Sequence, residues 1–255
     1  MGRVYAITNQ KGGVGKTTTA VNLSAALALA GKKVLLVDMD PQGNASSGVG
    51  IRPGEGERTS YDLIMGLAPC GETVRLSEIQ GLSVIPATRD LAGAEVELVS
   101  DPARSTRLKS ALADIVPLFD YTIMDCPPSL SLLTVNALVA AEAVIIPMQC
   151  EYYALEGLSQ LLHTVHRIKR SLNPSLDVRG ILLTMYDGRN NLSRQVAEEV
   201  KRHFSDKVFA SVIPRNVRLS EAPSHGKPVL LYDSRSAGAV SYQEVARELL
   251  AWGGC

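Results

Sequence analysis

The residues with the clearest chemical potential form a glycine-rich loop near the start of the chain. Residues 10–18 read Gln-Lys-Gly-Gly-Val-Gly-Lys-Thr-Thr, after a short apolar run and before an Ala/Leu-rich helical pattern. Glycines let backbone N–H groups approach phosphate oxygens, and the N-terminus of a following helix adds a partial positive charge. Lys16 supplies a charge for the β- and γ-phosphates, and the Thr17 hydroxyl suits Mg²⁺. We therefore expect a nucleotide phosphate site built by Gly12, Gly13, Gly15, Lys16, Thr17 and Thr18.

The loop departs from the usual phosphate-loop pattern at its first position. Gln10 stands where that pattern has glycine, and a second lysine, Lys11, follows it. This loop resembles the deviant Walker A loop of the ParA/MinD family of P-loop ATPases. In that family the extra lysine reaches the nucleotide of the other subunit, so the resemblance implies an ATP-dependent homodimer with Lys11 as a nucleotide ligand and catalytic residue. The alternative is that Lys11 is an ordinary solvated loop lysine.

Three aspartates follow apolar runs that are typical of buried parallel strands. Asp38 is the last residue of the run 33–38, and Asp40 follows two residues later. Asp125 is the last residue of the run 121–125. Carboxylates at the carboxyl ends of parallel strands face the ligand crevice, and an apolar strand closing on aspartate is the Walker B arrangement for Mg²⁺. The resemblance implies that Asp40 orients or deprotonates the attacking water and that Asp38 and Asp125, with Thr17, support the metal. The alternative is that these aspartates only cap turns.

The pattern of elements predicts the fold class. Strands are expected over residues 3–8, 33–38, 82–86, 121–125, 143–147, 178–184 and 208–213. Helices are expected over 17–30, 131–141, 155–171, 192–204 and 237–252, with a short helix within 216–225, a helical pattern interrupted by Pro102 over 90–117, and a mobile loop over 45–60. Strands alternating with helices of this length require parallel pairing. We predict one α/β domain over residues 1–255, a doubly wound, mostly parallel sheet flanked by helices.

Composition narrows the class of protein. The chain has 255 residues, 45% hydrophobic and 20% charged, which is ordinary for a soluble enzyme. It contains no apolar run of about 18 residues, and its start leads directly into a strand, so we expect no membrane span and no secretory signal. The cysteines are widely spaced, which disfavours structural zinc and a disulfide framework. The expected compartment is the cytoplasm.

The charge is unevenly distributed along the chain. Residues 1–162 carry 12 Lys/Arg and 17 Asp/Glu, a net of −5, whereas residues 163–235 carry 13 and 7, a net of +6. A local basic face can bind a phosphate backbone although the whole chain is neutral. Within this segment Arg189, Arg218 and Lys227 are the candidates for contacts with nonspecific double-stranded DNA. The alternative is a solvated surface, in which Arg218 pairs with Glu221 at i,i+3.

The resemblance extends over nearly the whole chain and becomes more specific toward its end. Four further motifs are similar to those of chromosomal ParA/Soj DNA-partitioning ATPases. They are Val-Asp-Met-Asp-Pro-Gln-Gly-Asn (37–44), Asp-Cys-Pro-Pro-Ser-Leu (125–130), Tyr-Tyr-Ala-Leu-Glu-Gly-Leu (152–158) and Ile-Pro-Arg-Asn-Val-Arg-Leu-Ser-Glu-Ala-Pro-Ser-His-Gly-Lys-Pro (213–228). This resemblance implies ATP and Mg²⁺ as cofactors and an adenine-binding loop containing Pro214 and Asn216. It also implies nucleoid association and a ParB-type centromere-binding partner that stimulates hydrolysis. The short stretch before the glycine-rich loop leaves no room for the N-terminal helix-turn-helix domain of larger plasmid ParA proteins, so none is expected.

Three other functions are alternatives to this one. An iron–sulfur cluster like that of nitrogenase iron protein would use Cys126, but no second cysteine lies in a matching motif, so Cys126 is expected to be a small buried apolar residue. A MinD-like membrane-associated ATPase would end in a Lys/Arg-rich amphipathic helix, whereas residues 243–255 contain one arginine and two glutamates. A nucleotide-dependent scaffold without hydrolysis is disfavoured by the presence of Asp40.

Overall fold

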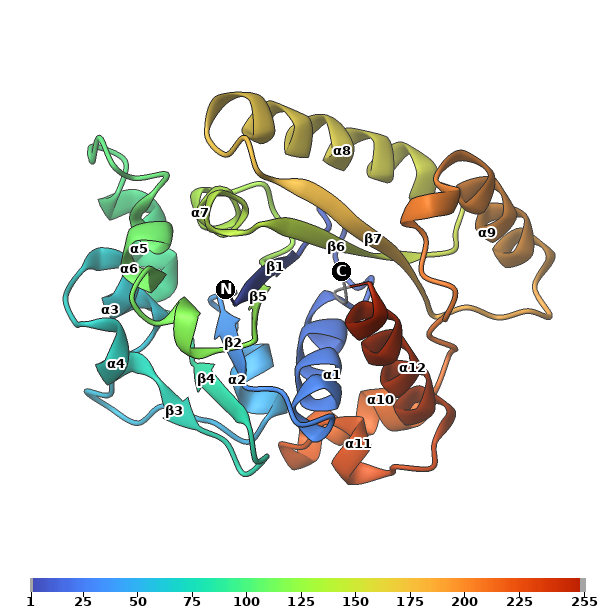
Figure 1. Ribbon diagram of the computed structural model, residues 1–255, viewed down its shortest axis with the longest axis horizontal. Helices are drawn as coiled ribbons and strands as arrows, with labels where there is room; N and C mark the ends of the chain where they lie inside the picture. The colour runs from blue at the N-terminus through green and yellow to red at the C-terminus, as the bar shows by residue number, and fades with distance from the viewer. Residues whose placement is uncertain (1, 253–255) are drawn as a thin grey trace.

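A twisted seven-stranded sheet runs through the centre of the computed structural model, which describes residues 2–252 (Figure 1). The strand order is β3-β4-β2-β5-β1-β6-β7, and every neighbouring pair is parallel except β3–β4. The strands are β1 (Arg3–Ile7), β2 (Val34–Asp38), β3 (Arg75–Leu76), β4 (Leu82–Ile85), β5 (Tyr121–Asp125), β6 (Ala143–Gln149) and β7 (Asp177–Thr184). The predicted mostly parallel, doubly wound α/β class is confirmed.

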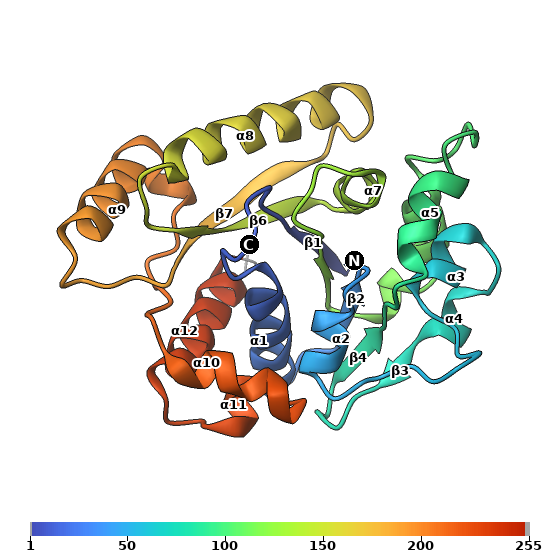
Figure 2. The same cartoon turned by 180° about the vertical axis from the view of Figure 1, so that it is seen from behind.

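Helices cover both faces of this sheet (Figures 1 and 2). One face carries α1 (Lys16–Leu29), α2 (Asn44–Gly48), α10 (Val217–Glu221), α11 (Val229–Tyr232) and α12 (Ala237–Ala251). The other carries α3 (Ser60–Met65), α4 (Cys70–Thr73), α5 (Leu91–Glu97), α6 (Arg107–Leu112), α7 (Leu132–Ala140), α8 (Ala154–Ser171) and α9 (Asn191–His203). Short 3₁₀ helices lie at Val116–Leu118, Ser205–Lys207 and Ala222–His225.

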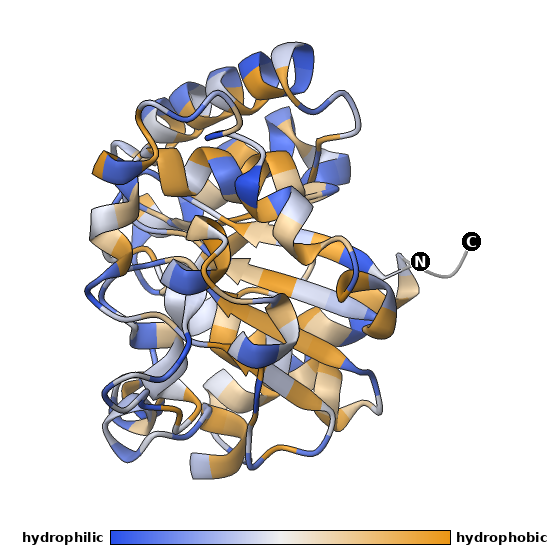
Figure 3. Ribbon diagram, turned by 90° about the vertical axis from the view of Figure 1, so that its left-hand side faces the viewer, coloured by the Kyte–Doolittle hydropathy of each residue, from blue (hydrophilic) through white to orange (hydrophobic). Residues whose placement is uncertain are grey.

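Each central strand supplies two hydrophobic cores at once, because successive side chains point to opposite faces. In β2, Leu35 and Val37 enter one core while Val34 and Leu36 enter the other, and all four are fully buried. The apolar colouring of the strands in Figure 3 follows from this two-sided burial. A continuous apolar run is therefore needed in such a strand, rather than an alternating one.

The register of the central strands brings the acidic residues to one edge. Asp38 pairs with Asp125 across β2 and β5, and Ile7 pairs with Asp125 across β1 and β5. The chain leaves β1 directly into the glycine-rich loop, whose last glycine precedes α1. The loop and both carboxylates thus lie together at the carboxyl edge of the sheet, where ligands of such folds bind.

The prediction of an outer strand over residues 208–213 is wrong. Only isolated bridges form there, Ile181 with Val208 and Tyr186 with Pro214. Between the bridges, the N–H groups of Ala210 and Ser211 donate to the carboxylate of Glu248, at 2.8 and 2.7 Å. These N–H groups are thereby satisfied without a neighbouring strand, and no regular ladder is built.

Two other stretches differ from the sequence-based expectation. Residues 45–60, expected to be a mobile loop, begin with helix α2 and end where the Thr59 side chain caps α3. The helical pattern over 90–117 divides into α5, α6 and a 3₁₀ turn, with the break around Pro102 as expected. Helices α3, α4 and α11 and the short antiparallel strand β3 were not predicted. Within residues 2–252, no helix is both long and apolar enough to cross a membrane.

Candidate active site

The glycine-rich loop is anchored on both sides by polar contacts. Thr184, at the end of β7, donates its hydroxyl to the carbonyl of Val14 at 2.8 Å. Asn9 donates to the carbonyl of Pro147 at 2.8 Å and accepts from the Lys11 N–H at 3.0 Å. These contacts connect the loop to the carboxyl ends of β6 and β7, so its backbone N–H groups are held in place before any anion arrives.

Lys16 is the only charged side chain of the loop that is buried. Its Nζ donates to the carbonyl of Lys11 at 3.0 Å, so the ammonium lies across the mouth of the loop. Burial lowers the pKa of Lys16, and the negative charge of Asp125 partly offsets that effect. A cation held inside a ring of backbone donors is suited to binding a polyphosphate.

Asp38 and Asp125 are fully buried next to each other, but their surroundings differ. Asp38 accepts from the backbone N–H and hydroxyl of Ser46, at 2.8 and 2.6 Å, and from the N–H of Asp40 at 3.1 Å. Burial raises the pKa of Asp38 to about 6, although the hydrogen bonds from Ser46 lower it. Its oxygens therefore serve to hold the loop that follows β2.

Asp125 has no such support. Neither of its carboxylate oxygens forms a hydrogen bond of ordinary geometry with the described residues, although both are buried and the Thr17 hydroxyl lies next to them. Burial, and secondly the negative charge of Asp38, raise the pKa of Asp125 well above its ordinary value, while the nearby Thr17 hydroxyl and Lys16 act in the opposite direction. Buried polar atoms almost always bind a hydrogen-bond donor or acceptor, a water molecule or an ion. A hard cation with oxygen ligands fits this carboxylate and the Thr17 hydroxyl.

Asp40 is almost completely buried at the start of the loop after β2. Its Oδ1 accepts from the N–H of Gln42 at 3.0 Å, which fixes the carboxylate in a tight turn. Its charge contributes to raising the pKa of both Asp38 and Asp125, so it lies close to each. Among Asp38, Asp40 and Asp125, Asp40 is thus the residue whose carboxylate is held in its turn through one oxygen.

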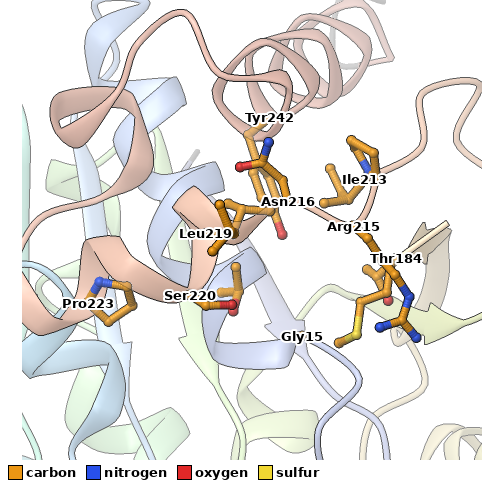
Figure 4. Close-up of a pocket in the computed structure, with 13 residues that line it drawn as sticks. Gly15, Thr184, Ile213, Arg215, Asn216, Leu219, Ser220, Pro223 and Tyr242 are labelled. Atoms are coloured by element: carbon orange, nitrogen blue, oxygen red, sulfur yellow. The ribbon is translucent and has the colours of Figure 1, made fainter. Parts of the chain in front are cut away.

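A cavity of about 430 Å³ opens beside the phosphate loop (Figure 4). Pro214 and Asn216, the predicted adenine-binding residues, line it together with Gly15 and Thr18 of the loop. The Asn216 Oδ1 accepts from the N–H of Arg218 and caps α10, so its amide nitrogen remains for another acceptor. Figure 4 shows Asn216, Leu219 and Ser220 between Tyr242 of α12 and Gly15. The cavity is continuous with the predicted phosphate site.

Several lining residues of this cavity were not identified from the sequence. Thr184 and Met185 come from the end of β7, Leu219 from α10 and Tyr242 from α12. Met185 has a φ of 48°, which is unusual for a residue other than glycine. Thr184 and Met185 lie at the carboxyl end of a parallel strand, a position that the general rule for such sheets marks as ligand-facing.

Lys11 and Gly12 lie on the exposed outer side of the loop. The Lys11 ammonium forms an ion pair with Glu151 of the same chain, near the end of β6. A Cβ built on Gly12 would meet no atom within 4 Å. A side chain at Gly12 therefore has room within this subunit, and any steric effect of it would have to come from another molecule.

The three predicted DNA-contact residues are all exposed, and two of them are paired with carboxylates. Arg189 is 92% exposed and binds both oxygens of Asp187, at 3.0 and 3.1 Å. Arg218 pairs with Glu221 at 2.7 Å, as the i,i+3 spacing predicted, and with Asp233 at 3.3 Å. The bridge of Tyr186 with Pro214 brings the Arg189 turn beside the segment that carries Arg218. Lys227 follows the 3₁₀ helix Ala222–His225.

The environment of Cys126 agrees with a structural role. It is fully buried, and burial raises the pKa of its thiol, so the thiol stays protonated. The prediction of a small buried apolar residue is confirmed. In the described part of the chain, no group of three or more His, Cys, Asp or Glu side chains is placed to hold a metal ion. Cys255 lies outside the described residues.

Comparison with known proteins agrees with this arrangement. A family model described as an AAA domain matches residues 2–178. The sporulation initiation inhibitor protein Soj of Bacillus subtilis is 59% identical over 253 residues, which are 99% of this chain and 100% of that protein. The chromosome partitioning protein ParA of Caulobacter vibrioides is 56% identical over 251 residues, covering 98% of this chain and 94% of that protein.

Solved structures show the same fold at lower identity. A structure described as cobyrinic acid a,c-diamide synthase from Mycobacterium smegmatis, with bound ADP and magnesium, is 39% identical with a TM-score of 0.87, covering 100% of this chain and 96% of that chain. The cell division ATPase MinD of Pyrococcus furiosus is 27% identical with a TM-score of 0.82, covering 99% and 100%. The higher identity to Soj and ParA, over nearly their full lengths, places this chain in the Soj/ParA family of chromosome-partitioning ATPases.

Proposed function

We propose that this protein is a Mg²⁺-dependent ATPase whose ATP-bound dimer binds DNA nonspecifically during chromosome partitioning and is released on hydrolysis. The observation that carries the proposal is the unpartnered, buried carboxylate of Asp125 beside Lys16 and Thr17, next to a cavity large enough for a base. A related solved structure is described with bound ADP and magnesium, which supports the same ligands here.

Different residues of this chain bind the phosphates, hold the metal and position the attacking water. The loop N–H groups and Lys16 hold the phosphates, and Thr17 and Asp125 hold Mg²⁺, which would neutralise phosphate charge when bound. Asp38 maintains the loop that places Asp40, and Asp40 orients or deprotonates the attacking water. No arginine lies in the loop itself, so turnover by the isolated protein is expected to be slow.

Replacement of Asp40 tests this assignment. Asp40→Ala is expected to bind ATP and Mg²⁺ but to lose hydrolysis, measured as phosphate release under single-turnover conditions. Asp114→Ala, at an exposed carboxylate remote from the loop, is the matched control and should hydrolyse at the wild-type rate. Normal hydrolysis by the Asp40 variant would rule out its catalytic role.

The exposed side of the loop supports a dimer interface. Lys11 would leave Glu151 and reach the phosphates of the facing subunit, and Gly12 would admit the facing backbone closely. With Asp40→Ala protein, light scattering should give a doubled mass with ATP and a single mass with ADP. An equal mass in both nucleotides would exclude the sandwich dimer.

Two copies of the basic segment on one dimer would give the DNA affinity. Phosphate contacts by Arg189, Arg218 and Lys227 carry no sequence information, and each adds to the salt dependence of binding. Arg218→Glu should weaken binding to unrelated duplexes alike and reduce the salt slope, with the ATP-dependent mass unchanged. Arg89→Glu makes the same charge change at an exposed position outside the basic segment and should retain DNA affinity. Equal DNA affinity in both variants would place the DNA-binding face elsewhere.

The partner proposal rests on the relation to Soj and ParA. A ParB-type protein is expected to accelerate hydrolysis when DNA is also present. The test is the ATPase rate alone, with DNA, with a candidate ParB-type protein, and with both. A constant rate in the four conditions would contradict the partitioning cycle, and cosedimentation with liposomes in ATP would instead favour a MinD-like membrane function.

A further inference from the structure

Helix α2 is tied at its centre to the acidic edge of the nucleotide site. The Ser46 N–H and hydroxyl both donate to Asp38, at 2.8 and 2.6 Å, and the Ser46 hydroxyl accepts from the N–H of Ala87 at 3.0 Å. Ser46 is almost completely buried, as is Asp38. The position of α2 is therefore fixed by the same carboxylate that supports the turn of Asp40.

The chain just beyond α2 touches the basic C-terminal segment, backbone against backbone. A Cβ built on Gly50 would lie 3.1 Å from the carbonyl oxygen of Gly226, and one built on Gly226 would lie 3.1 Å from the Cα of Gly50. Both glycines have positive φ values, 82° and 63°. Gly226 directly precedes Lys227, one of the proposed DNA contacts. Because even an added Cβ would be crowded by the facing backbone, no side chain lies between the two glycines to absorb a displacement.

Helix α1 holds the same segment from its other side. The Asn22 amide donates to the carbonyl of Thr18 at 2.8 Å and accepts from the N–H of Val229 at 2.8 Å. A Cβ on Gly48 would lie 3.2 Å from the Val21 side chain, so α2 packs closely against α1 (Figures 1 and 2). Residues 222–229 are thus held between the phosphate-loop helix and α2.

We propose that α2 and the Gly50–Gly226 contact form a relay through which the occupied phosphate site sets the position of the Arg218–Lys227 segment. Binding of the metal-bound nucleotide beside Asp125 and Asp38 shifts the loop after β2, which is hydrogen-bonded to Asp38 through both Asp40 and Ser46. The shift passes along the short helix to Gly50 and, by direct backbone contact, to Gly226. The relay rests on the proposed function. In that function, dimerisation brings two basic segments together, and the relay adds a conformational change within each subunit.

A matched pair of glycine substitutions tests the relay. Gly50→Ala and Gly56→Ala impose the same backbone strain, since the φ values are 82° and 78°, but only the first adds a methyl group against Gly226. With a non-hydrolysable ATP analogue, both variants should bind nucleotide and dimerise like wild type. Gly50→Ala should lose about tenfold in the DNA affinity of the nucleotide-bound form, while Gly56→Ala keeps it. Equal DNA affinity in the two variants would overturn the relay.

Amide hydrogen exchange separates failure of the relay from failure of the proposed function, because it needs no DNA. In wild type, the analogue should change the exchange of amides in residues 217–229, and Gly50→Ala should abolish that change. Ser46→Ala, at the other end of the relay, should abolish it as well, which keeps the test valid if Gly50→Ala folds poorly. An unaltered response in both variants overturns the relay. If the analogue changes the exchange in wild type and the two substitutions abolish that change, but wild type does not bind DNA, the DNA function is overturned and the relay is retained.

Discussion

Two carboxyl groups buried side by side beneath the phosphate loop should make the nucleotide-free protein less stable as pH rises. The folded-state pKa of Asp38 is raised to about 6 and that of Asp125 is raised well above its ordinary value. The folded protein therefore binds protons that the unfolded chain has already released. The stabilisation is fully present below the unfolded-state pKa, near 3.8, and is lost as pH rises through the folded-state values.

The size of the effect follows from the shift at Asp38. A rise from 3.8 to about 6 corresponds to about 3 kcal/mol over the whole transition. Between pH 5 and pH 7.5 about 1 kcal/mol of this is lost, because part of the transition lies below pH 5. For a protein of this size, that loss lowers the Tm by about 2–4 °C, and Asp125 adds to it. Carboxylates with lowered pKa values, such as Asp177, act below this pH range.

Thermal unfolding of the nucleotide-free protein at pH 5, 6 and 7.5 measures the effect. Asp125→Asn removes one of the two buried carboxyl groups whose pKa is raised, so the variant should show a smaller pH dependence and a higher Tm than wild type at pH 7.5. Asp114→Asn, at an exposed position, should behave like wild type. Mg²⁺ with ADP should reverse the wild-type trend, since a bound cation favours the ionised form. A wild-type Tm that rises from pH 5 to 7.5 without nucleotide would refute the reasoning.

Four further substitutions have expected outcomes. Lys16→Ala should abolish nucleotide binding in calorimetric titration, because the only buried cation of the loop is lost. Gly12→Val should leave the nucleotide-free Tm unchanged, since its Cβ has nothing within 4 Å, while preventing the ATP-dependent mass increase in light scattering. Asn216→Ser should retain the α10 cap and the Tm but weaken nucleotide affinity about tenfold, through loss of the amide donor. Leu36→Ala should lower the free energy of unfolding by about 2–5 kcal/mol in urea titration.

The sequence was sufficient to predict the six parallel strands of the sheet and the position of the glycine-rich loop because their signals are local. Glycines, Lys16 and Thr17 lie within one short loop, and continuous apolar runs ending in aspartate identify β2 and β5. The i,i+3 spacing of Arg218 and Glu221 likewise predicted an ion pair that the structure contains. In each case the interacting groups are close in sequence, or the rule for parallel strands determines where they meet.

The features that were missed depend on contacts between distant parts of the chain. Residues 208–213 are rich in the β-branched and aromatic residues typical of strands, but the carboxylate of Glu248 in α12 accepts from two of their N–H groups. Helix α2 has a weak local signal, and its Ser46 is held by Asp38 and Ala87. The second partner of Arg218, Asp233, lies beyond an intervening helix. Tertiary contacts outweigh local propensity at these sites.

The proposed phosphate-binding and base-binding parts of the nucleotide site come from segments that are far apart in the sequence. Gly15 and Thr18 lie at the start of α1, whereas Asn216, Leu219 and Tyr242 are synthesised about two hundred residues later. Thr19 of α1 and Tyr242 of α12 also join their hydroxyls at 3.1 Å, which closes the first and last helices on each other. A nascent chain on the ribosome therefore displays a phosphate loop long before it has a pocket for a base. High-affinity nucleotide binding is therefore expected only after α12 has emerged and docked, so that ATP would selectively stabilise chains in which α12 is in place.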